Sequence, residues 1–368
     1  MHYHIILTTK CNSQCKYCYE KSMNDFDTDI EQKVNLDLSA PESSEIDATA
    51  LKKFINKDIN PVIIFYGGEP LLNINKIKEI IDNIDVSYRM QTNGKLLDKL
   101  PIDYLNKIGK ILVSIDGDNE RTDFNRGKGT YNLVMKNISL IKEKGYLGEI
   151  IARMTLNWES TDIFEQVLHL IDSGFSSVHW QIDAGFYAYD YDKEKFSLFV
   201  KEYNSSITKL IDYWIGQMKN QKVLKLYPFI GIVDSLLKSE ITLLRCGAGH
   251  SGYAIRTDGK LVACPIMTWI QDFVSGDLNS DPRELKKFPM AKRCKNCEIK
   301  NICGGRCLYW QYLKLWPEEG NELICKTIKH LVAELKNKIP EIKELIDKET
   351  ISYKDFEYEK YFGPEIIP

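Results

Sequence analysis

Short apolar runs alternate with longer amphipathic segments through residues 1–230 of the chain. The predicted strands are Tyr3–Thr8, Val62–Tyr66, Ser87–Gln91, Ile111–Ile115, Ile150–Thr155 and Val178–Ile182. The segments with a helical period are Ala48–Ile55, Ile74–Ile84, Leu96–Ile108, Tyr131–Lys144 and Ser160–Ser173. Such alternation is typical of parallel strands with helices packed outside them, so the pattern predicts an α/β fold.

The rest of the pattern is less regular. The elements expected from it are a polar, acidic insertion over residues 20–52 with one or two short helices, a β-hairpin over Ser251–Ile255 and Lys260–Ala263, and helices over Leu323–Lys338 and Glu341–Lys348. The hairpin is expected because Asp258-Gly259 lies between two apolar runs. The tail from Ser352 to Pro368 is open to three interpretations: a segment packed over the barrel mouth, a peptide-docking segment or a loose end.

Composition narrows the function classes. The 368 residues are enough for a sizeable core and two domains. The net charge is −3, from 49 basic and 52 acidic residues, so we expect no nucleic-acid partner. The apolar runs are too short to span a bilayer, and the N-terminus lacks a signal-peptide pattern. We therefore expect a cytoplasmic protein without a membrane partner.

Three of the ten cysteines lie in one short loop after the first predicted strand. Cys11, Cys15 and Cys18 are separated by three and then two residues, and Tyr17 precedes the last of them. Three thiolates can hold three irons of a [4Fe–4S] cube and leave the fourth iron open to a substrate. The alternative is a zinc site, but zinc usually takes four nitrogen or sulfur ligands and no fourth is obvious nearby.

This cysteine loop resembles the cluster loop of the radical S-adenosylmethionine (SAM) enzymes, and the resemblance covers about the first 230 residues. It implies a partial (β/α)6 barrel in which SAM chelates the open iron. It also implies that an electron from the cluster cleaves the bond between sulfur and C5′ of SAM. The resulting 5′-deoxyadenosyl radical would then abstract a hydrogen from the substrate.

Special residues follow the ends of the predicted strands, where ligands collect in α/β folds. Gly67 and Gly68 allow a close approach of the backbone to a ligand. Near the fourth strand end, Arg126 precedes Gly127 in a pattern that resembles the family's pocket. The resemblance implies SAM contacts from Tyr17, Gly67, Gly68, Glu69, Pro70, Thr92, Asn93, Ser114, Asp116 and Arg153. The alternatives are helix capping for the polar strand-end residues and a structural salt bridge for Arg153.

The sixth predicted strand has a polar face. His179, Gln181 and Asp183 alternate with apolar residues and therefore share one side of the strand. Asp183 or His179 is a candidate proton acceptor in catalysis. The alternative is that both are structural groups whose hydrogen bonds are satisfied within the fold.

The other cysteines lie between residues 246 and 325, and disulfides rarely persist in the cytoplasm. Their order and spacing resemble the SPASM domain that follows the barrel in many radical SAM enzymes. The resemblance implies two auxiliary [4Fe–4S] clusters, one held by Cys294, Cys297, Cys303 and Cys325 and the other by Cys246, Cys264 and Cys307. The second would have an open iron or a further ligand such as His250. The chain is thus predicted to hold three [4Fe–4S] clusters and to consist of a barrel over residues 1–230, a SPASM domain over 231–340 and a C-terminal helix and tail over 341–368.

SPASM enzymes mostly modify residues within peptides and proteins, so a peptide or protein substrate is expected. The electron donor would be a protein such as ferredoxin or flavodoxin. One alternative is formylglycine formation in sulfatases, although Pro265 stands where those enzymes carry an aspartate. The others are a radical SAM oxidoreductase for a small metabolite and a non-catalytic iron–sulfur electron carrier.

Overall fold

The computed structural model describes residues 1–18, 33–159, 161–187 and 190–368. The chain divides into two compact units. Unit 1 consists of Met1–Ile151 and Gly247–Pro289, and unit 2 consists of Ala152–Cys246 and Met290–Pro368. The division falls within strand β5 (Glu149–Leu156), so each unit is described by itself.

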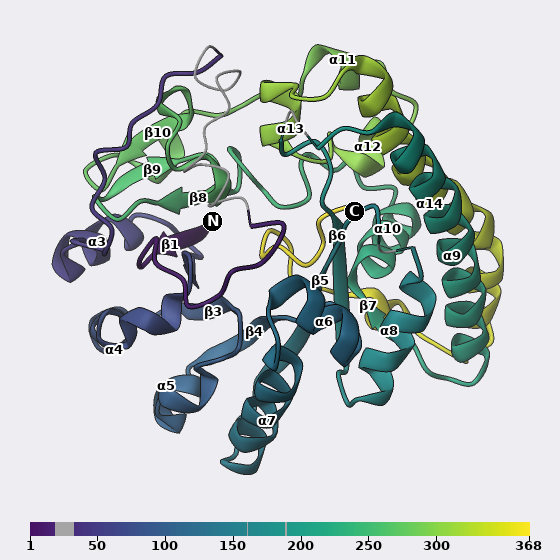
Figure 1. The fold of residues 1–368 in the computed structure, drawn as a ribbon, viewed down its shortest axis with the longest axis horizontal. Helices are drawn as coiled ribbons and strands as arrows, with labels where there is room; N and C mark the ends of the chain where they lie inside the picture. Colours follow the sequence, from purple (N-terminus) through teal and green to yellow (C-terminus); the bar gives the residue numbers. More distant parts are fainter. Residues whose placement is uncertain (19–32, 160, 188–189) are drawn as a thin grey trace. The chain divides into compact units, whose positions relative to one another are not determined.

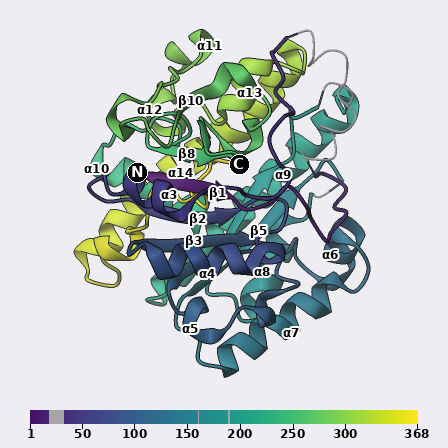
Figure 2. The same cartoon turned by 90° about the vertical axis from the view of Figure 1, so that its left-hand side faces the viewer.

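Unit 1 is built on a mostly parallel sheet with the strand order β10-β9-β8-β1-β2-β3-β4. Its strands are β1 (His2–Ile6), β2 (Val62–Tyr66), β3 (Ser87–Thr92), β4 (Ile108–Ser114), β8 (Gly252–Ile255), β9 (Lys260–Val262) and β10 (Val274–Asp277). The turned view shows β1, β2 and β3 side by side (Figure 2). Strands β8 and β9 pair antiparallel, which confirms the predicted hairpin.

The helices of unit 1 are α3 (Ala48–Ile55), α4 (Ile74–Asn83), α5 (Ile102–Leu105), α6 (Asn119–Arg126) and α7 (Thr130–Glu143). Figure 1 shows α3, α4, α5 and α7 along the outer side of its parallel strands. Helix α4 buries Ile77, Ile80 and Ile81, the spacing of an amphipathic helix packed on a sheet. The helix predicted over 96–108 is wrong in extent: α5 begins after Pro101, which has no N–H to continue a helix, and Ile108 already belongs to β4.

Unit 2 combines short strands with long helices. Strand β6 (Ser177–Ile182) pairs in parallel with β7 (Lys225–Leu226). The helices are α8 (Ile163–Asp172), α9 (Lys193–Lys219), α10 (Tyr227–Lys238), α11 (Lys292–Lys295), α12 (Lys300–Cys303), α13 (Leu308–Leu313) and α14 (Glu318–Asp347). Helices α9 and α14 lie side by side (Figure 1).

Two features of unit 2 differ from the predicted pattern. The two helices predicted at the C-terminal end form the single helix α14, and Pro340 lies on its exposed side. Helices α9 and α10 were not among the predicted elements, although Phe196, Val200 and Tyr203 of α9 are buried with a helical period.

The C-terminal tail is packed within unit 2. Phe362, Glu365 and Ile367 are each at most 1% exposed. The backbone of Ile366 lies against His179 of β6. The tail is therefore not a loose end, whereas packing over the barrel mouth and peptide docking stay predictions.

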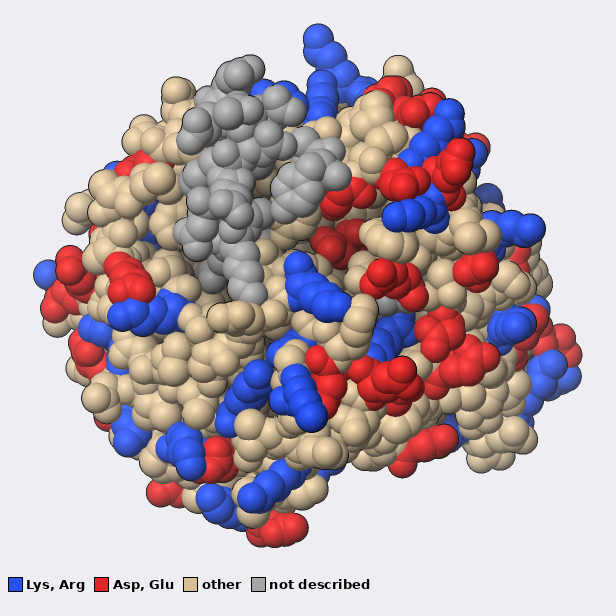
Figure 3. Space-filling model, viewed as in Figure 1, with Lys and Arg blue, Asp and Glu red and all other residues tan. Residues whose placement is uncertain are grey.

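The α/β class is confirmed, whereas the predicted insertion is only partly described. Its residues 20–32 lie outside the described residues, and 33–47 contain no helix. The predicted domain boundaries stay a prediction, because the two compact units divide the chain differently. Basic and acidic side chains are mixed on the face shown in Figure 3. Among the helices of the described residues, none is long and apolar enough to cross a bilayer.

Candidate active site

The end of β2 packs directly against the chain that leads into the cysteine loop. A Cβ atom on Gly67 would lie 2.3 Å from the carbonyl oxygen of Thr8, and one on Gly68 would lie 2.3 Å from that of Lys10. The amides of Gly68 and Glu69 donate to the same two oxygens, at 2.9 and 2.8 Å. Only glycine fits at these positions, and the close approach seen here is to the cysteine loop.

Glu69 joins the end of β2 to the end of β3. Its buried carboxylate accepts hydrogen bonds from the Thr92 hydroxyl (2.7 Å) and the amides of Asn93 (2.7 Å) and Leu71 (3.0 Å). Burial raises the pKa of Glu69 to about 7, although these donors favour the ionised form. Pro70, which begins a short 3-10 turn, is also buried. Glu69, Thr92 and Asn93, which are three of the predicted SAM contacts, thus form one hydrogen-bonded group.

Asn93 extends this group into the cysteine loop. Its side-chain amide donates to the Sγ atom of Cys11 at 3.7 Å and to Oδ1 of Asn12 at 2.7 Å. Asn12 was not predicted as a site residue, and nothing in the hydrophobic pattern marks it. The first part of the loop is therefore held by the ends of β2 and β3.

The last part of the loop is held by the residues that follow β4. The Tyr17 hydroxyl donates to Asp116, and Arg126 makes two further bonds to the same carboxylate. Asp116 is fully buried, so this arrangement supports a role in holding the loop, and direct contact with SAM stays a prediction. Ser114 ends β4 and is half-buried.

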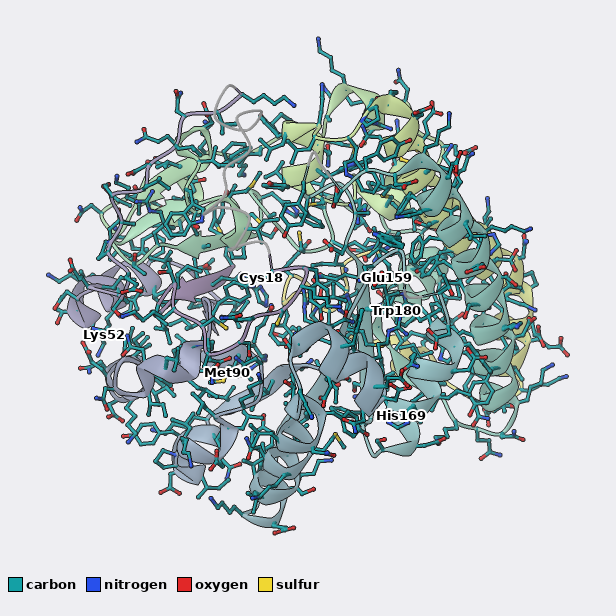
Figure 4. The ribbon with its side chains drawn as sticks, in the orientation of Figure 1. Cys18, Lys52, Met90, Glu159, His169 and Trp180 are labelled. Carbon is teal, nitrogen blue, oxygen red and sulfur yellow. The ribbon has the colours of Figure 1, made fainter. Side chains whose placement is uncertain are left out.

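The cysteine loop offers donors that fit an iron–sulfur cluster. A [4Fe–4S] cube binds each thiolate through a different iron, and Cys11, Cys15 and Cys18 supply three thiols from one loop. The amide donor at Cys11 is a feature of iron–sulfur sites, where hydrogen bonds to sulfur tune the cluster. Figure 4 labels Cys18, the last cysteine of this loop.

Unit 2 brings four of the predicted cluster ligands near one another. They are Cys294 of α11, Cys297, Cys303 of α12 and Cys325 of α14. Burial raises the pKa of Cys294 to about 11, and the other three thiols add to this rise through their proximity. Burial likewise raises the pKa of Cys303 to about 11, while the amides of Gly305 and Arg306 donate to its sulfur. Since metal binding displaces thiol protons, this donor set fits the predicted cluster.

The third set of cysteines is divided between the units. Cys264 belongs to unit 1, whereas Cys246 and Cys307 belong to unit 2. Their shared cluster therefore stays a prediction, as does the role of His250.

Two neighbouring residues of β6 contact different parts of unit 2, and the shared polar face of His179, Gln181 and Asp183 stays a prediction. Trp180 points toward the helices, where its indole N–H donates to the Tyr203 hydroxyl at 3.0 Å and its ring packs against Phe229 (Figure 4). Gln181 accepts a hydrogen bond of 2.7 Å from Arg153 of β5. Arg153, a predicted SAM contact, is thus a neighbour of Gln181 on β6.

The two candidate proton acceptors differ in their electrostatic surroundings. Burial and the charge of Arg153 hold the pKa of His179 well below its usual range. Burial raises the pKa of Asp183 to about 8, with a further contribution from Asp190 and an opposing one from Arg306. Asp183 can therefore exchange a proton near neutral pH, whereas His179 stays neutral.

Residues 5–171 match the family model of the radical SAM superfamily. This match begins near the end of β1 and covers the cysteine loop, the glycine turn after β2 and the strands from β2 to β5.

The chain carries a radical SAM domain.

The similarity to curated relatives extends beyond this radical SAM domain. The radical SAM cyclopropyl synthase TigE of Paramaledivibacter caminithermalis is 24% identical over 334 residues, which cover 83% of this chain and 67% of TigE. The cysteine-type anaerobic sulfatase-maturating enzyme of Clostridium perfringens is 23% identical over 327 residues, with 81% of this chain and 85% of the relative covered.

Solved structures share the fold. The structure of anSMEcpe with bound AdoMet has a TM-score of 0.72 at 17% identity and covers 94% of this chain and 97% of its own. Streptococcus suis SuiB bound to precursor peptide SuiA has a TM-score of 0.51 at 15% identity and covers 84% and 72%. The expected radical SAM fold is therefore confirmed.

Outside the radical SAM domain, sequence reasoning missed Arg306. It is buried, has a positive φ of 55° and precedes Cys307. Its guanidinium donates to the carbonyl oxygens of Ile182 (2.9 Å) and Ala184 (3.3 Å), on either side of Asp183. An arginine between two glycines and a cysteine was a visible signal, but its partners lie more than a hundred residues earlier in the chain.

Proposed function

We propose that this chain generates a 5′-deoxyadenosyl radical and oxidatively modifies a residue of a peptide or protein. A [4Fe–4S] cluster on Cys11, Cys15 and Cys18, with SAM bound, would supply the one-electron cleavage of SAM. The observation that carries the proposal is the attachment of the cysteine loop to the ends of β2 and β3. Glu69 and Asn93 hold the first loop cysteine beside the glycine turn that is expected to bind SAM.

Different residues of the chain would bind SAM and accept a proton from the substrate. Gly67, Gly68, Glu69, Pro70, Thr92, Asn93, Ser114 and Asp116 would shape the SAM site in unit 1. Arg153 would pair with the SAM carboxylate, a contact that its fixed hydrogen bond to Gln181 favours. Asp183 would accept a proton from the substrate, because its pKa of about 8 allows exchange near neutral pH. Two auxiliary clusters would bring the total to three.

Relatives support a peptide or protein substrate. SuiB is solved with precursor peptide SuiA, and anSMEcpe with a Cp18Cys peptide. TigE is named as a cyclopropyl synthase. The named activities of the relatives differ, so they support a class of substrate and do not identify the bond that is formed in it. The electron would come from a carrier such as ferredoxin or flavodoxin.

A second candidate is formylglycine formation. It is favoured by similarity to the cysteine-type anaerobic sulfatase-maturating enzyme over 85% of that enzyme's length. Pro265 speaks against it, because it begins a 3-10 turn at the position where an aspartate is expected. Incubation with a cysteine-containing sulfatase peptide would separate the candidates, since formylglycine replaces the thiol with an aldehyde.

The main test is anaerobic reconstitution followed by reduction with dithionite. Wild-type protein should form 5′-deoxyadenosine from SAM, whereas a Cys11→Ala/Cys15→Ala/Cys18→Ala protein should lose about four irons and all cleavage. Mass spectrometry of a peptide encoded beside the gene should show a loss of two hydrogens. If no peptide or protein is altered while a free metabolite drives 5′-deoxyadenosine formation, the proposed substrate class is wrong.

A further inference from the structure

We propose that Asp116 and Arg126 form a clamp that positions the second half of the cysteine loop through the hydroxyl of Tyr17. The inference rests on the proposed function, because the loop is taken to hold a cluster. It adds a role for Tyr17 of the loop, Asp116 after β4 and Arg126 at the end of α6. We call this group the Tyr17 clamp.

The base of the clamp is a buried ion pair. Asp116 is fully buried, and Arg126 is 7% exposed. Nε of Arg126 donates to Oδ2 of Asp116, and Nη2 donates to Oδ1, both at 2.9 Å. Such a two-point contact fixes the orientation of the carboxylate as well as its position.

Tyr17 is attached to this pair in two ways. Its hydroxyl donates to Oδ2 of Asp116. The guanidinium carbon of Arg126 lies 5.3 Å from the centre of the Tyr17 ring, within the range of a cation–π contact. One contact holds the end of the side chain and the other holds the face of the ring, so the two together restrict its placement.

The backbone of the loop is held at the same place. The amide of Lys16 donates to the carbonyl oxygen of Asn125 at 2.9 Å. Asn125 and Arg126 are the last two residues of α6, so the end of this helix contacts two successive residues between Cys15 and Cys18. Asn93 and the glycine turn hold the first part of the loop, and the end of α6 contacts the second part.

The turn between β4 and α6 orders the clamp in advance. The Asp118 side chain caps α6 by accepting from the amide of Arg121 at 2.9 Å. The amide of Asp116 donates to the Thr122 hydroxyl at 3.2 Å. Gly127, with a φ of 102°, ends the helix directly after Arg126. Because these contacts lie outside the cysteine loop, the clamp would set the positions of Cys15 and Cys18 before a cluster binds and so reduce the ordering cost.

The test uses Tyr17→Phe, which keeps the ring and removes the hydroxyl. The measurement is the anaerobic release of iron to a chelator from reconstituted protein, counting only the iron that the triple loop-cysteine variant lacks. We expect release from Tyr17→Phe to be roughly tenfold faster, the effect of losing a hydrogen bond to a charged group. The matched control is Tyr88→Phe, which removes a buried hydroxyl bonded to the carbonyl oxygen of Ile84. It should release iron at the wild-type rate.

Asp116→Asn provides a second test of the clamp, because it keeps the shape of the side chain and removes its charge. It should also speed iron release and alter the EPR spectrum of the reduced loop cluster, since the Arg126 charge would no longer be neutralised. Wild-type release rates and spectra in both variants would overturn the clamp while leaving the proposed function intact. Absence of loop iron from wild-type protein would overturn the proposed function and the clamp together.

Discussion

The side-chain amide of Asn93 donates a hydrogen bond to the sulfur of Cys11, with nitrogen and sulfur 3.7 Å apart. The backbone of Asn93 is held in turn by the carboxylate of Glu69 at 2.7 Å. A residue expected to contact SAM thus touches a predicted cluster ligand. Hydrogen bonds to cluster sulfurs help to set reduction potentials, so this contact links the end of β3 to the electronic properties of the proposed cluster.

Replacing Asn93 with alanine should make the midpoint potential of the loop cluster more negative. The amide stabilises negative charge on the Cys11 sulfur, and that stabilisation is larger in the reduced cluster. An EPR-monitored redox titration measures the change. Asn137→Ala is the matched control, because its buried side-chain amide donates to the backbone carbonyl oxygen of Gly94 at 3.0 Å. Equal potentials in both variants would contradict the role of Asn93.

Replacing Cys325 with alanine should remove about four irons and leave SAM cleavage in place. The reason is that Cys325 lies near Cys294 and Cys303 in unit 2, apart from the loop cysteines in the sequence. Iron and sulfide analysis together with a 5′-deoxyadenosine assay provides the measurement. Retention of all iron, or stoichiometric zinc in wild-type protein, would count against an auxiliary cluster at this site.

Arg153→Ala should weaken SAM binding by tenfold or more, the size expected for losing one charge-assisted contact with a carboxylate. Calorimetry on reconstituted protein under anaerobic conditions measures the affinity. The control is Arg89→Ala, since Arg89 of β3 donates to the backbone of Tyr88. Unchanged affinity in Arg153→Ala would defeat its assignment as a SAM ligand.

Product formation should rise with pH through about 8 if Asp183 acts as the base. Its pKa of about 8 means that most molecules carry the protonated, inactive form at pH 7. Asp183→Asn should abolish the activity. Asp190→Asn should move the rise to lower pH, because the charge of Asp190 contributes to the raised pKa of Asp183. A profile that stays in place in Asp190→Asn would contradict this account.

The buried tail should make the protein less stable as the pH rises from about 4.5 to about 7. Burial raises the pKa of Glu365 from 4.5 to about 7. Within this window the unfolded chain loses the proton and the folded chain keeps it, so unfolding becomes easier as pH increases. Glu365→Gln should remove a decline on the order of 3 kcal/mol, measured by denaturant unfolding at both ends of the window.

The control for this measurement is Glu322→Gln, which changes an exposed glutamate on α14. It should retain the wild-type pH dependence. Glu69 shifts in the same direction as Glu365, but it is present in both proteins and cancels in the comparison. An identical pH dependence in Glu365→Gln and wild-type protein would show that the tail carboxyl does not titrate as expected.

The sequence pattern predicts the bounds of an element correctly where an apolar or amphipathic run has clear ends. Strand β2 and helix α3 match the predicted ranges residue for residue. The apolar run of β2 lies between Pro61 and Gly67, neither of which extends a strand easily. The helix predicted over 96–108 is wrong in extent, because Pro101 within this range interrupts backbone hydrogen bonding.

The sequence by itself determined the family of the first domain and the chemistry expected there, because the spacing of Cys11, Cys15 and Cys18 predicts cluster ligands without reference to the fold. Tertiary structure alone decided which groups hold the loop: Glu69 and Asn93 at its start, and Asp116 and Arg126 at its end. The hydrogen bond between Asn93 and Glu69 joins residues 24 positions apart, and the one between Tyr17 and Asp116 joins residues 99 positions apart. A polar contact of this kind leaves no periodic trace in the sequence, since it depends on which strand ends become neighbours in the folded sheet.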